Sequence, residues 1–190
     1  MSKKLTTAEM GRMSVDQYRE ADKLPLVVVL DNVRSQHNVG AVFRTADAMR
    51  IERVLLCGIC CCPPNPELHK TALGAEESVE WQYYKDTIEA VRALQADGYT
   101  VYAVEQAHNS VTLEEVAEQI TNGKSQITNC PKIAIILGHE VFGVQQEVID
   151  ICSQCIEIPQ YGTKHSMNVS VTAGIVMYRL ASSLRLATKK

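Results

Sequence analysis

The sequence contains no apolar run long enough to cross a membrane, which takes about 20 residues. Its longest apolar runs, residues 24–30 and 133–137, have the length of strands. The amino terminus, MSKKLTTAEM, has two lysines but no apolar core behind them, so it does not resemble a secretory signal. These absences predict a cytosolic protein with no membrane segment.

Three glycine-containing signatures of common enzyme classes are also missing. No G-x-G-x-x-G follows the first apolar run, which argues against the usual dinucleotide-binding fold. There is no P-loop for a nucleoside triphosphate and no G-x-S-x-G around a serine nucleophile. Ser166 lies beside His165, but adjacent residues seldom place a nucleophile and its base correctly, so hydrolysis is a remote alternative.

The chain has no excess of positive charge, and its formal net charge is −3. Nucleic-acid binders are often basic, so the global charge argues mildly against RNA, although binding needs only local positive charge. The available cations could form such a patch or simply a solvated surface: Lys3, Lys4, Arg12, Arg34, Arg44, Arg50, Lys70, Lys164, Lys189 and Lys190.

Cysteine occurs in an odd number, seven, and without a secretory signal, which favours reduced thiols over a disulfide framework. Cys57 with Cys60, and Cys152 with Cys155, form two C-x-x-C pairs. Four thiolates could bind zinc. The alternative, which we favour, is that the cysteines are small buried apolar side chains, so no metal is expected.

Apolar runs of strand length alternate with segments of helical periodicity along the 190 residues. This alternation predicts an α/β fold with a mostly parallel sheet and helices on both faces. Residues 24–186 fit one domain, with a helical arm at 1–23 and a basic tail at 187–190. Ligands of such sheets bind beyond the carboxyl ends of the strands, so the polar loops after the strands are the candidate site.

In the first of these loops, Asn38 and Gly40 precede a helix predicted at 41–50 that carries Arg44. Asn38 could cap this helix, and Gly40 could permit the close approach of another backbone. Arg44 lies among apolar residues and needs an anionic partner. An internal ion pair and a bound anion both satisfy that need.

Two further loops combine polar and small residues. After residues 133–137, Gly138 and Gly143 bracket His139 and Glu140, as in a tight turn that admits a ligand to the backbone. Taken alone, an ordinary strand–turn–helix connection explains this loop better. The third loop, residues 158–168, precedes the longest predicted helix and carries Ser166 and Asn168, which are typical helix-start residues.

In this order and spacing the three loops resemble the three motifs of the SpoU/TrmH family in the SPOUT class of RNA methyltransferases. The matching segments are DNVRSQHNVGAVFRTADA, IILGHEVFGV and IEIPQYGTKHSMNVSVTAGIVMYRL, and KTALGAEESV resembles the family's connecting segment. The resemblance covers residues 25–180, and three ordered motifs make it specific.

The resemblance implies a deep trefoil knot in the carboxyl-terminal part, S-adenosylmethionine (SAM) as cofactor, and a homodimer with the site at its interface. It assigns cofactor binding to Gly138, Ile158, Met167, Glu105, Gln106 and Ala107. Met167 stands where the family usually has leucine, a residue of similar volume. His139 and His165 occupy positions where the family varies, and they receive no role.

The implied reaction transfers a methyl group from SAM to a ribose 2′-hydroxyl of RNA, and the hydroxyl proton must leave as the bond forms. The family assigns this proton transfer to the arginine of its first motif, here Arg44. Because arginine stays charged in proteins, we favour a role in orienting an RNA phosphate and stabilising negative charge. Asn38 would position Arg44 or the ribose, and hydrogen bonds from Glu140, Ser166 and Asn168 would shape the catalytic site.

A compact enzyme of this kind is expected to recognise an exposed loop by its shape and unpaired bases, which favours tRNA over rRNA. An rRNA methyltransferase is the nearest alternative. A catalytically inactive RNA-binding or assembly factor of the same fold is a second. A metabolic α/β enzyme that matches the motifs by chance is a third, and failure to bind SAM would favour it.

Overall fold

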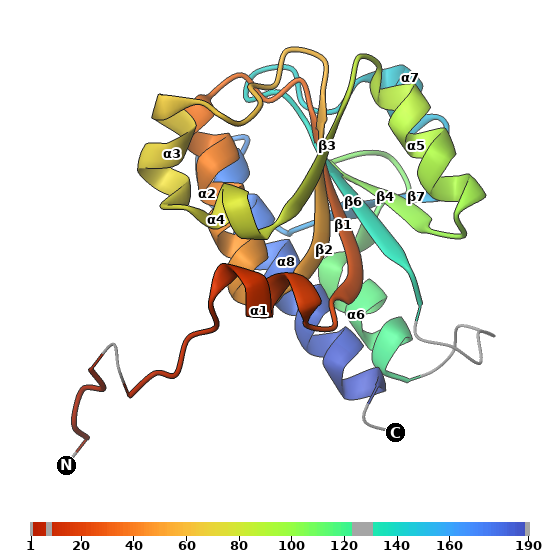
Figure 1. Cartoon of the computed structure of the whole chain (residues 1–190). Helices are drawn as coiled ribbons and strands as arrows, with labels where there is room; N and C mark the ends of the chain where they lie inside the picture. The colour runs from red at the N-terminus through yellow and green to blue at the C-terminus, as the bar shows by residue number, and fades with distance from the viewer. Residues whose placement is uncertain (1, 7–8, 123–130, 189–190) are drawn as a thin grey trace.

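We describe the fold from a computed structural model, which defines residues 2–6, 9–122 and 131–188. A seven-stranded sheet has the order β3-β2-β1-β6-β4-β7-β5 (Figure 1). Every pair of neighbouring strands is parallel, which confirms the predicted α/β class. The strands are β1 (Leu24–Asp31), β2 (Ile51–Cys57), β3 (Glu80–Tyr84), β4 (Thr100–Val104), β5 (Val111–Thr112), β6 (Ile133–Leu137) and β7 (Gln154–Glu157).

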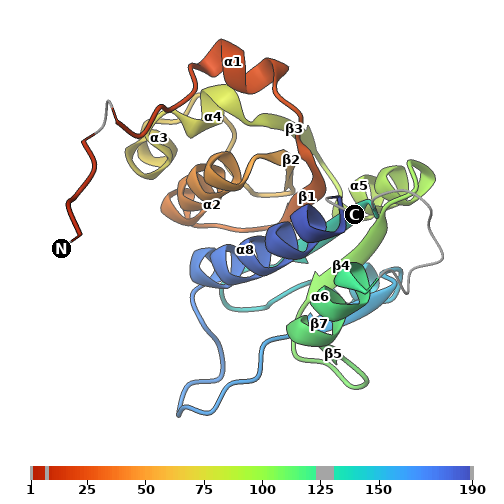
Figure 2. The ribbon, with the colours of Figure 1, turned by 90° about the horizontal axis from the view of Figure 1, so that it is seen from below.

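Helices cover both faces of the sheet. One core layer contains side chains of α2, α3, α6 and α8, and the other contains side chains of α5 and α7. Figure 2 shows α8 running between α2 and α6 on one side of the sheet. The helices are α1 (Val15–Glu20), α2 (Gln36–Met49), α3 (Pro66–Ala72), α4 (Ala75–Ser78), α5 (Thr87–Ala96), α6 (Leu113–Thr121), α7 (Gln146–Ile149) and α8 (Val169–Ala187).

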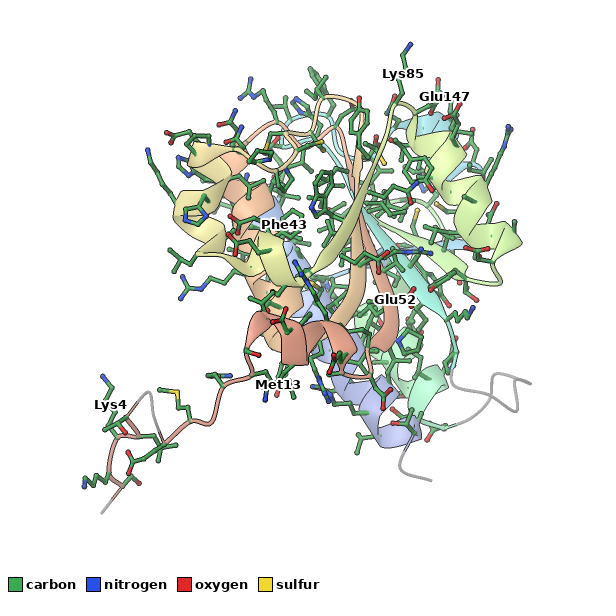
Figure 3. The ribbon with its side chains drawn as sticks, viewed as in Figure 1. Lys4, Met13, Phe43, Glu52, Lys85 and Glu147 are labelled. Atoms are coloured by element: carbon green, nitrogen blue, oxygen red, sulfur yellow. The ribbon has the colours of Figure 1, made fainter. Side chains whose placement is uncertain are left out.

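The central strand β1 explains why the sheet needs two layers of cover. Successive side chains of a strand point to opposite faces, and Val28 and Leu30 enter one core layer while Val27 and Val29 enter the other. All four are fully buried. On the α2 side, Phe43 points from the helix into the first layer (Figure 3).

Several elements differ from the sequence prediction. The helix predicted at 41–50 begins at Gln36, because the Ser35 hydroxyl caps it by accepting from the Asn38 amide. The cap predicted at Asn38 is therefore wrong. Of the arm predicted as helix over 1–23, the described residues are helical only over Val15–Glu20, where Ser14 and Gln17 form a capping box.

The short elements α3, α4 and β5 were not predicted. Prolines are typical of loops, yet Pro66 occupies the first turn of α3, where a missing N–H costs nothing, and Asn65 caps the helix. Lys189 and Lys190, part of the predicted tail, and Cys130 lie outside the described residues. No helix within 2–6, 9–122 and 131–188 is long and apolar enough to cross a membrane.

The carboxyl ends of the parallel strands meet at one edge of the sheet. In Figure 3, Lys85, directly after β3, and Glu147 on α7 both stand at this edge. Asp31 at the end of β1 is fully buried there. Its carboxylate accepts from the Thr87 hydroxyl at 2.6 Å and from the Gln145 amide at 3.0 Å, so it ties the loop after β6 to the sheet.

Candidate active site

A pocket of about 1000 Å³ opens where β4, β6 and β7 end, a size typical of small-molecule sites. It brings together nine of the eleven residues predicted for the site, contributed by the ends of three strands and the loops that follow. These nine are Glu105, Gln106, Ala107, Gly138, Glu140, Ile158, Ser166, Met167 and Asn168. The remaining two, Asn38 and Arg44, are not lining residues.

A five-residue turn after β6 forms one wall of the pocket. The His139 and Gly143 backbones exchange hydrogen bonds of 3.0 and 2.8 Å, which close the turn. Gly138 lies so close to its far side that a Cβ there would be 2.0 Å from the Gly143 carbonyl carbon. Gly143 itself has φ of 69°, which favours glycine. Both glycines are therefore required by the turn, although an ordinary strand–turn–helix connection explained the loop better from the sequence alone.

Residues 105 and 106, after β4, hold this turn and the third loop in place. The Glu105 carboxylate accepts from the Val144 amide at 3.2 Å and from the Gln106 amide at 3.0 Å. The Gln106 side-chain amide donates to the His165 carbonyl at 3.0 Å. One strand end thus braces two opposite walls of the pocket.

Glu140 is the most heavily bonded carboxylate of the site. It accepts from the backbone amides of Arg34 at 3.0 Å and Ser35 at 2.9 Å, and from the Asn38 side chain at 2.9 Å. Burial acts to raise the pKa of Glu140, but these hydrogen bonds and one from its own amide outweigh burial and lower the pKa to about 2. Glu140 is thus a carboxylate at neutral pH and too weak a base to take a proton.

Asn38 and Asn168 continue the network from Glu140. The Asn168 side-chain amide donates to the Asn38 side-chain oxygen at 3.2 Å, and the Asn168 oxygen accepts from the Ser170 amide at 2.9 Å to cap α8. Asn168 is therefore both the helix start that was predicted and part of the site. Ser166, the other predicted helix-start residue, is exposed and does not cap α8.

Arg44 projects from α2 without an acidic partner. Its side chain is exposed, and no described residue forms an ion pair or hydrogen bond with it. The internal ion pair considered from the sequence is therefore absent among these residues. Arg44 lies six residues beyond Asn38, which places it about 9 Å farther along α2 and roughly 120° around the axis. An arginine so placed is available to an external anion.

The cysteine pairs do not come together as a metal site. Cys57 packs into one core layer and Cys60 into the opposite one. Burial raises the pKa of both thiols, and that of Cys152, to about 12, so they are protonated at neutral pH. Within the described ranges, no group of three or more histidine, cysteine or acidic side chains could hold a metal ion.

Three residues near the site received no role from the sequence. Asp31 can be noticed in the sequence as an acidic residue that ends an apolar run. Its partners Thr87 and Gln145 are distant in the sequence, so the sequence does not indicate these contacts. His139 accepts hydrogen bonds through Nδ1 from the backbone of its own turn. Phe142 follows it and is 82% exposed, which no sequence pattern indicates.

We expect Glu140→Gln to destabilise the protein by about 1–3 kcal/mol at neutral pH, because it weakens the acceptor of two loop amides. The folded-state pKa of Glu140, about 2, lies below its ordinary value of 4.5. The stabilisation by the charge is thus complete above about pH 4.5 and is lost as the pH falls toward about 2. Urea unfolding of both proteins from neutral pH to about pH 3 measures this difference.

The control for this experiment is Glu147→Gln, which changes an exposed carboxylate on α7 that has no described partner. This variant should unfold within about 0.5 kcal/mol of the wild type at every pH. A destabilisation by Glu140→Gln that stays constant as the pH falls would show that the charge of Glu140 has no part in holding the loops.

Comparison with known proteins identifies relatives of the chain. A model of the family described as SpoU rRNA Methylase matches residues 25–178. A 23S rRNA (guanosine-2′-O-)-methyltransferase RlmB from Vibrio parahaemolyticus is 29% identical over 181 residues, which cover 95% of this chain and 68% of that protein. The RlmB of Neisseria meningitidis is 30% identical over 156 residues, covering 80% of this chain and 56% of that protein.

A tRNA (guanosine(18)-2′-O)-methyltransferase from Thermus thermophilus is 28% identical over 172 residues, which cover 90% of this chain and 81% of that protein. Among solved structures, the TrmH/SpoU tRNA modifying enzyme of A. aeolicus superimposes with a TM-score of 0.74 at 24% identity, covering 92% of this chain and 83% of that chain. An AdoMet-bound rRNA methyltransferase from Sinorhizobium meliloti gives a TM-score of 0.71 at 24% identity, covering 90% of this chain and 61% of that chain.

Proposed function

The chain belongs to the SpoU rRNA methylase family, and we propose that it transfers a methyl group from SAM to a ribose 2′-hydroxyl of RNA, with tRNA as the substrate. The observation that carries this proposal is the chain of hydrogen bonds from Glu140 through Asn38 to Asn168. It joins the three family motifs, which are far apart in the sequence, at the mouth of one pocket. The related proteins modify guanosine ribose in 23S rRNA or in tRNA.

The pocket suits SAM in size and lining. Its volume of about 1000 Å³ accommodates a nucleoside with an amino-acid arm. Gly138 and Gly143 in its wall are packed so closely that a Cβ would clash with the backbone of the turn at Gly138 and with the Glu105 carboxylate at Gly143. We assign cofactor binding to Gly138, Ile158, Met167, Glu105, Gln106 and Ala107, all of which line the pocket. When bound, SAM supplies an electrophilic methyl group on a sulfonium. No metal is part of the proposal.

The side chains around the pocket orient the ribose rather than remove its proton. Glu140 is committed to accepting hydrogen bonds and holds Asn38 in a fixed orientation. Asn38 in turn orients the side-chain amide of Asn168, which lines the pocket. Ser166 is an exposed lining residue of the same pocket, and we assign it a hydrogen bond to the RNA.

Arg44 provides the positive charge that the reaction needs. The ribose oxygen would take the methyl group as its bond to sulfur breaks, leaving neutral S-adenosylhomocysteine, and the hydroxyl proton would pass to water. A guanidinium stabilises the negative charge that develops on the ribose oxygen while holding an adjacent phosphate. Because Arg44 is not a lining residue of the pocket in its own chain, we propose that it serves the pocket of a second copy. The functional unit is then a homodimer in which each site combines residues of two chains.

An apolar stripe on α8 supports the homodimer. Val171, Ile175 and Tyr178 are 54%, 39% and 63% exposed, and their spacing places them on one face of the helix. This face begins three residues after Asn168, at the pocket mouth. Burying it against a second copy would bring two pockets close to the shared interface. Sedimentation of the purified protein at several concentrations tests the dimer.

The remaining elements of the proposal concern topology and cellular context. The order of the strands, with β6 inserted between β1 and β4, supports a trefoil knot in the carboxyl-terminal part. An experimental structure traced through residues 138–187 would test it.

We assign residues 1–23 to an arm and 187–190 to a basic tail around a domain at 24–186, and we place the protein in the cytosol. Limited proteolysis and cell fractionation test these two assignments.

The proposed activity is tested with total tRNA from a strain that lacks the gene. The purified protein is incubated with this tRNA and methyl-labelled SAM, and the labelled nucleoside is identified by mass spectrometry. A labelled 2′-O-methylnucleoside is the expected result. Label in rRNA alone would replace tRNA by rRNA as the substrate. No label in either RNA, with SAM bound, would favour an inactive RNA-binding factor.

We expect Asn168→Ala to lower both stability and activity. The loss of the α8 cap should cost about 1 kcal/mol, and loss of the hydrogen bond to Asn38 should slow methyl transfer about 10-fold or more. Asn168→Ser separates the two roles, because serine still caps a helix but cannot reach Asn38. It should keep the stability within about 0.5 kcal/mol and lose as much activity as Asn168→Ala.

Urea unfolding and single-turnover methylation measure the two effects of the Asn168 substitutions. Full activity in Asn168→Ser would mean that the contact with Asn38 has no part in the reaction. Unchanged stability in Asn168→Ala would mean that the cap bonds to Ser170 and Val171 are replaced by other acceptors.

A further inference from the structure

One aromatic ring stands exposed at the rim of the pocket. Phe142 lines the pocket but is 82% exposed, and its neighbour Val141 is 71% exposed. A single exposed apolar side chain is common on protein surfaces. This one differs because it lies two residues after Glu140. At 3.8 Å per residue, its Cα is at most about 7.6 Å from that of Glu140.

The turn that carries Phe142 holds the ring in a defined direction. Besides the paired hydrogen bonds between His139 and Gly143, Nδ1 of His139 accepts from the amides of Val141 at 3.0 Å and Phe142 at 3.4 Å. These bonds fix the backbone on both sides of the aromatic residue. An exposed ring on so constrained a turn loses little further entropy when a ligand packs on it.

His139 extends the aromatic surface. Its ring centroid lies 4.9 Å from that of Phe142, with an angle of 36° between the planes. Because Nδ1 accepts two hydrogen bonds, the proton of the neutral imidazole is on Nε2. The pair therefore offers an apolar face for stacking and one N–H donor beside it, a combination suited to the face and the edge of a nucleobase.

We propose that Phe142, packed against His139, stacks on an unpaired base next to the target ribose. This inference rests on the proposed function and narrows its substrate to nucleotides in single-stranded loops. Stacking requires an unpaired base but tolerates any base, because each has a π face. The ring would thus hold a flanking nucleotide while the network of Glu140, Asn38 and Asn168 orients the ribose.

The extent of the apolar surface favours RNA over a second protein copy at this position. The apolar exposure of the turn comes from two neighbouring side chains, Val141 and Phe142, whereas a stable protein interface buries about 800 Å² on each partner. The longer stripe on α8 is the better candidate for that interface. The pocket that Phe142 lines also carries the polar side chains of Gln106, Gln160 and His165, which suit a nucleotide.

The first test compares Phe142→Ala with Phe142→Trp and Val141→Ala. Phe142→Ala should lower kcat/KM for tRNA about 10- to 100-fold, whereas Phe142→Trp, which retains a stacking surface, should stay near the wild type. Val141→Ala removes apolar surface from the same turn without a ring and should change kcat/KM less than about threefold. All three should bind SAM with the wild-type Kd in calorimetry. Unchanged kcat/KM in Phe142→Ala would overturn the proposal.

The second test does not depend on catalysis. Trp81 is the one tryptophan of the chain, so the fluorescence of Phe142→Trp minus that of the wild type reports on position 142. Titration with tRNA should quench this difference signal, and titration with a fully paired RNA duplex should not. Equal signals with both RNAs would overturn the proposal.

Two further results separate this proposal from the proposed function. If Phe142→Ala sediments as a monomer while the wild type is a dimer, the ring contacts a second copy and the stacking proposal is wrong. If the wild type methylates neither tRNA nor rRNA, the proposed function is wrong, and the fluorescence titration still decides whether a base stacks on position 142.

Discussion

Gly138→Ala is expected to raise the Kd for SAM more than about 100-fold, equivalent to about 2.7 kcal/mol. The added Cβ would lie 2.0 Å from the Gly143 carbonyl carbon and 2.2 Å from both its oxygen and the Val144 nitrogen. All three are backbone atoms, so the turn itself must move, and the wall of the pocket moves with it. Calorimetric titration with SAM measures the affinity.

The same substitution should leave the protein folded. Inserting one methyl group into a packed site costs about 1–3 kcal/mol, less than the stability of an ordinary domain. Gly162→Ala is the matched control, because a Cβ there meets nothing within 4 Å. We expect that variant to bind SAM like the wild type. If Gly138→Ala bound SAM with the wild-type affinity, the turn after β6 would not be part of the cofactor site.

The sheet could be predicted from the sequence because burial on both faces leaves a simple pattern. Residues 24–30 and 133–137 are continuous apolar runs, and they are the adjacent central strands β1 and β6. At the edge of the sheet the pattern is weaker. The two residues of β5, Val111 and Thr112, pair only with the end of β7, so no run of strand length marks them.

The start of α2 shows how a local prediction failed for a physical reason. Asn38 is a good capping residue in isolation, but Ser35 lies three residues earlier and takes that role. This frees the Asn38 side chain, which instead bonds to Glu140 and Asn168. The competition between two possible caps is decided by tertiary contacts, which periodicity does not contain.

The candidate site itself could not be derived from local pattern. Asn38 is separated by 102 residues from Glu140 and by 130 residues from Asn168. Their contact depends on the strand order, which places β6 beside β1. The parallel sheet predicted that the loops lie at one edge, but only the ordered motifs of a known family indicated which residues of these three loops act together. The exposure of Phe142 could be predicted neither from local sequence pattern nor from the family motifs, because it follows from the shape of one turn.

Arg44→Ala should slow methyl transfer about 1000-fold, because it removes the charge that stabilises the developing anion. Stability should change by less than about 0.5 kcal/mol, since the side chain is exposed on a helix and has no described partner. Single-turnover methylation and urea unfolding measure both. Arg92→Ala, at an exposed arginine of α5 with no described partner, is the control and should keep full activity.

The position of Arg44 adds a sharper test, which uses the two inactive variants together. If Arg44 serves the pocket of the second copy, a mixed dimer of Arg44→Ala and Gly138→Ala chains has one complete site. It joins the intact pocket of the first chain to the intact arginine of the other. Random mixing then restores about a quarter of the wild-type activity, because half of the dimers are mixed and each has one working site. If Arg44 served its own chain, every site in the mixture would lack either the arginine or the pocket, and the activity would stay at the level of the separate variants.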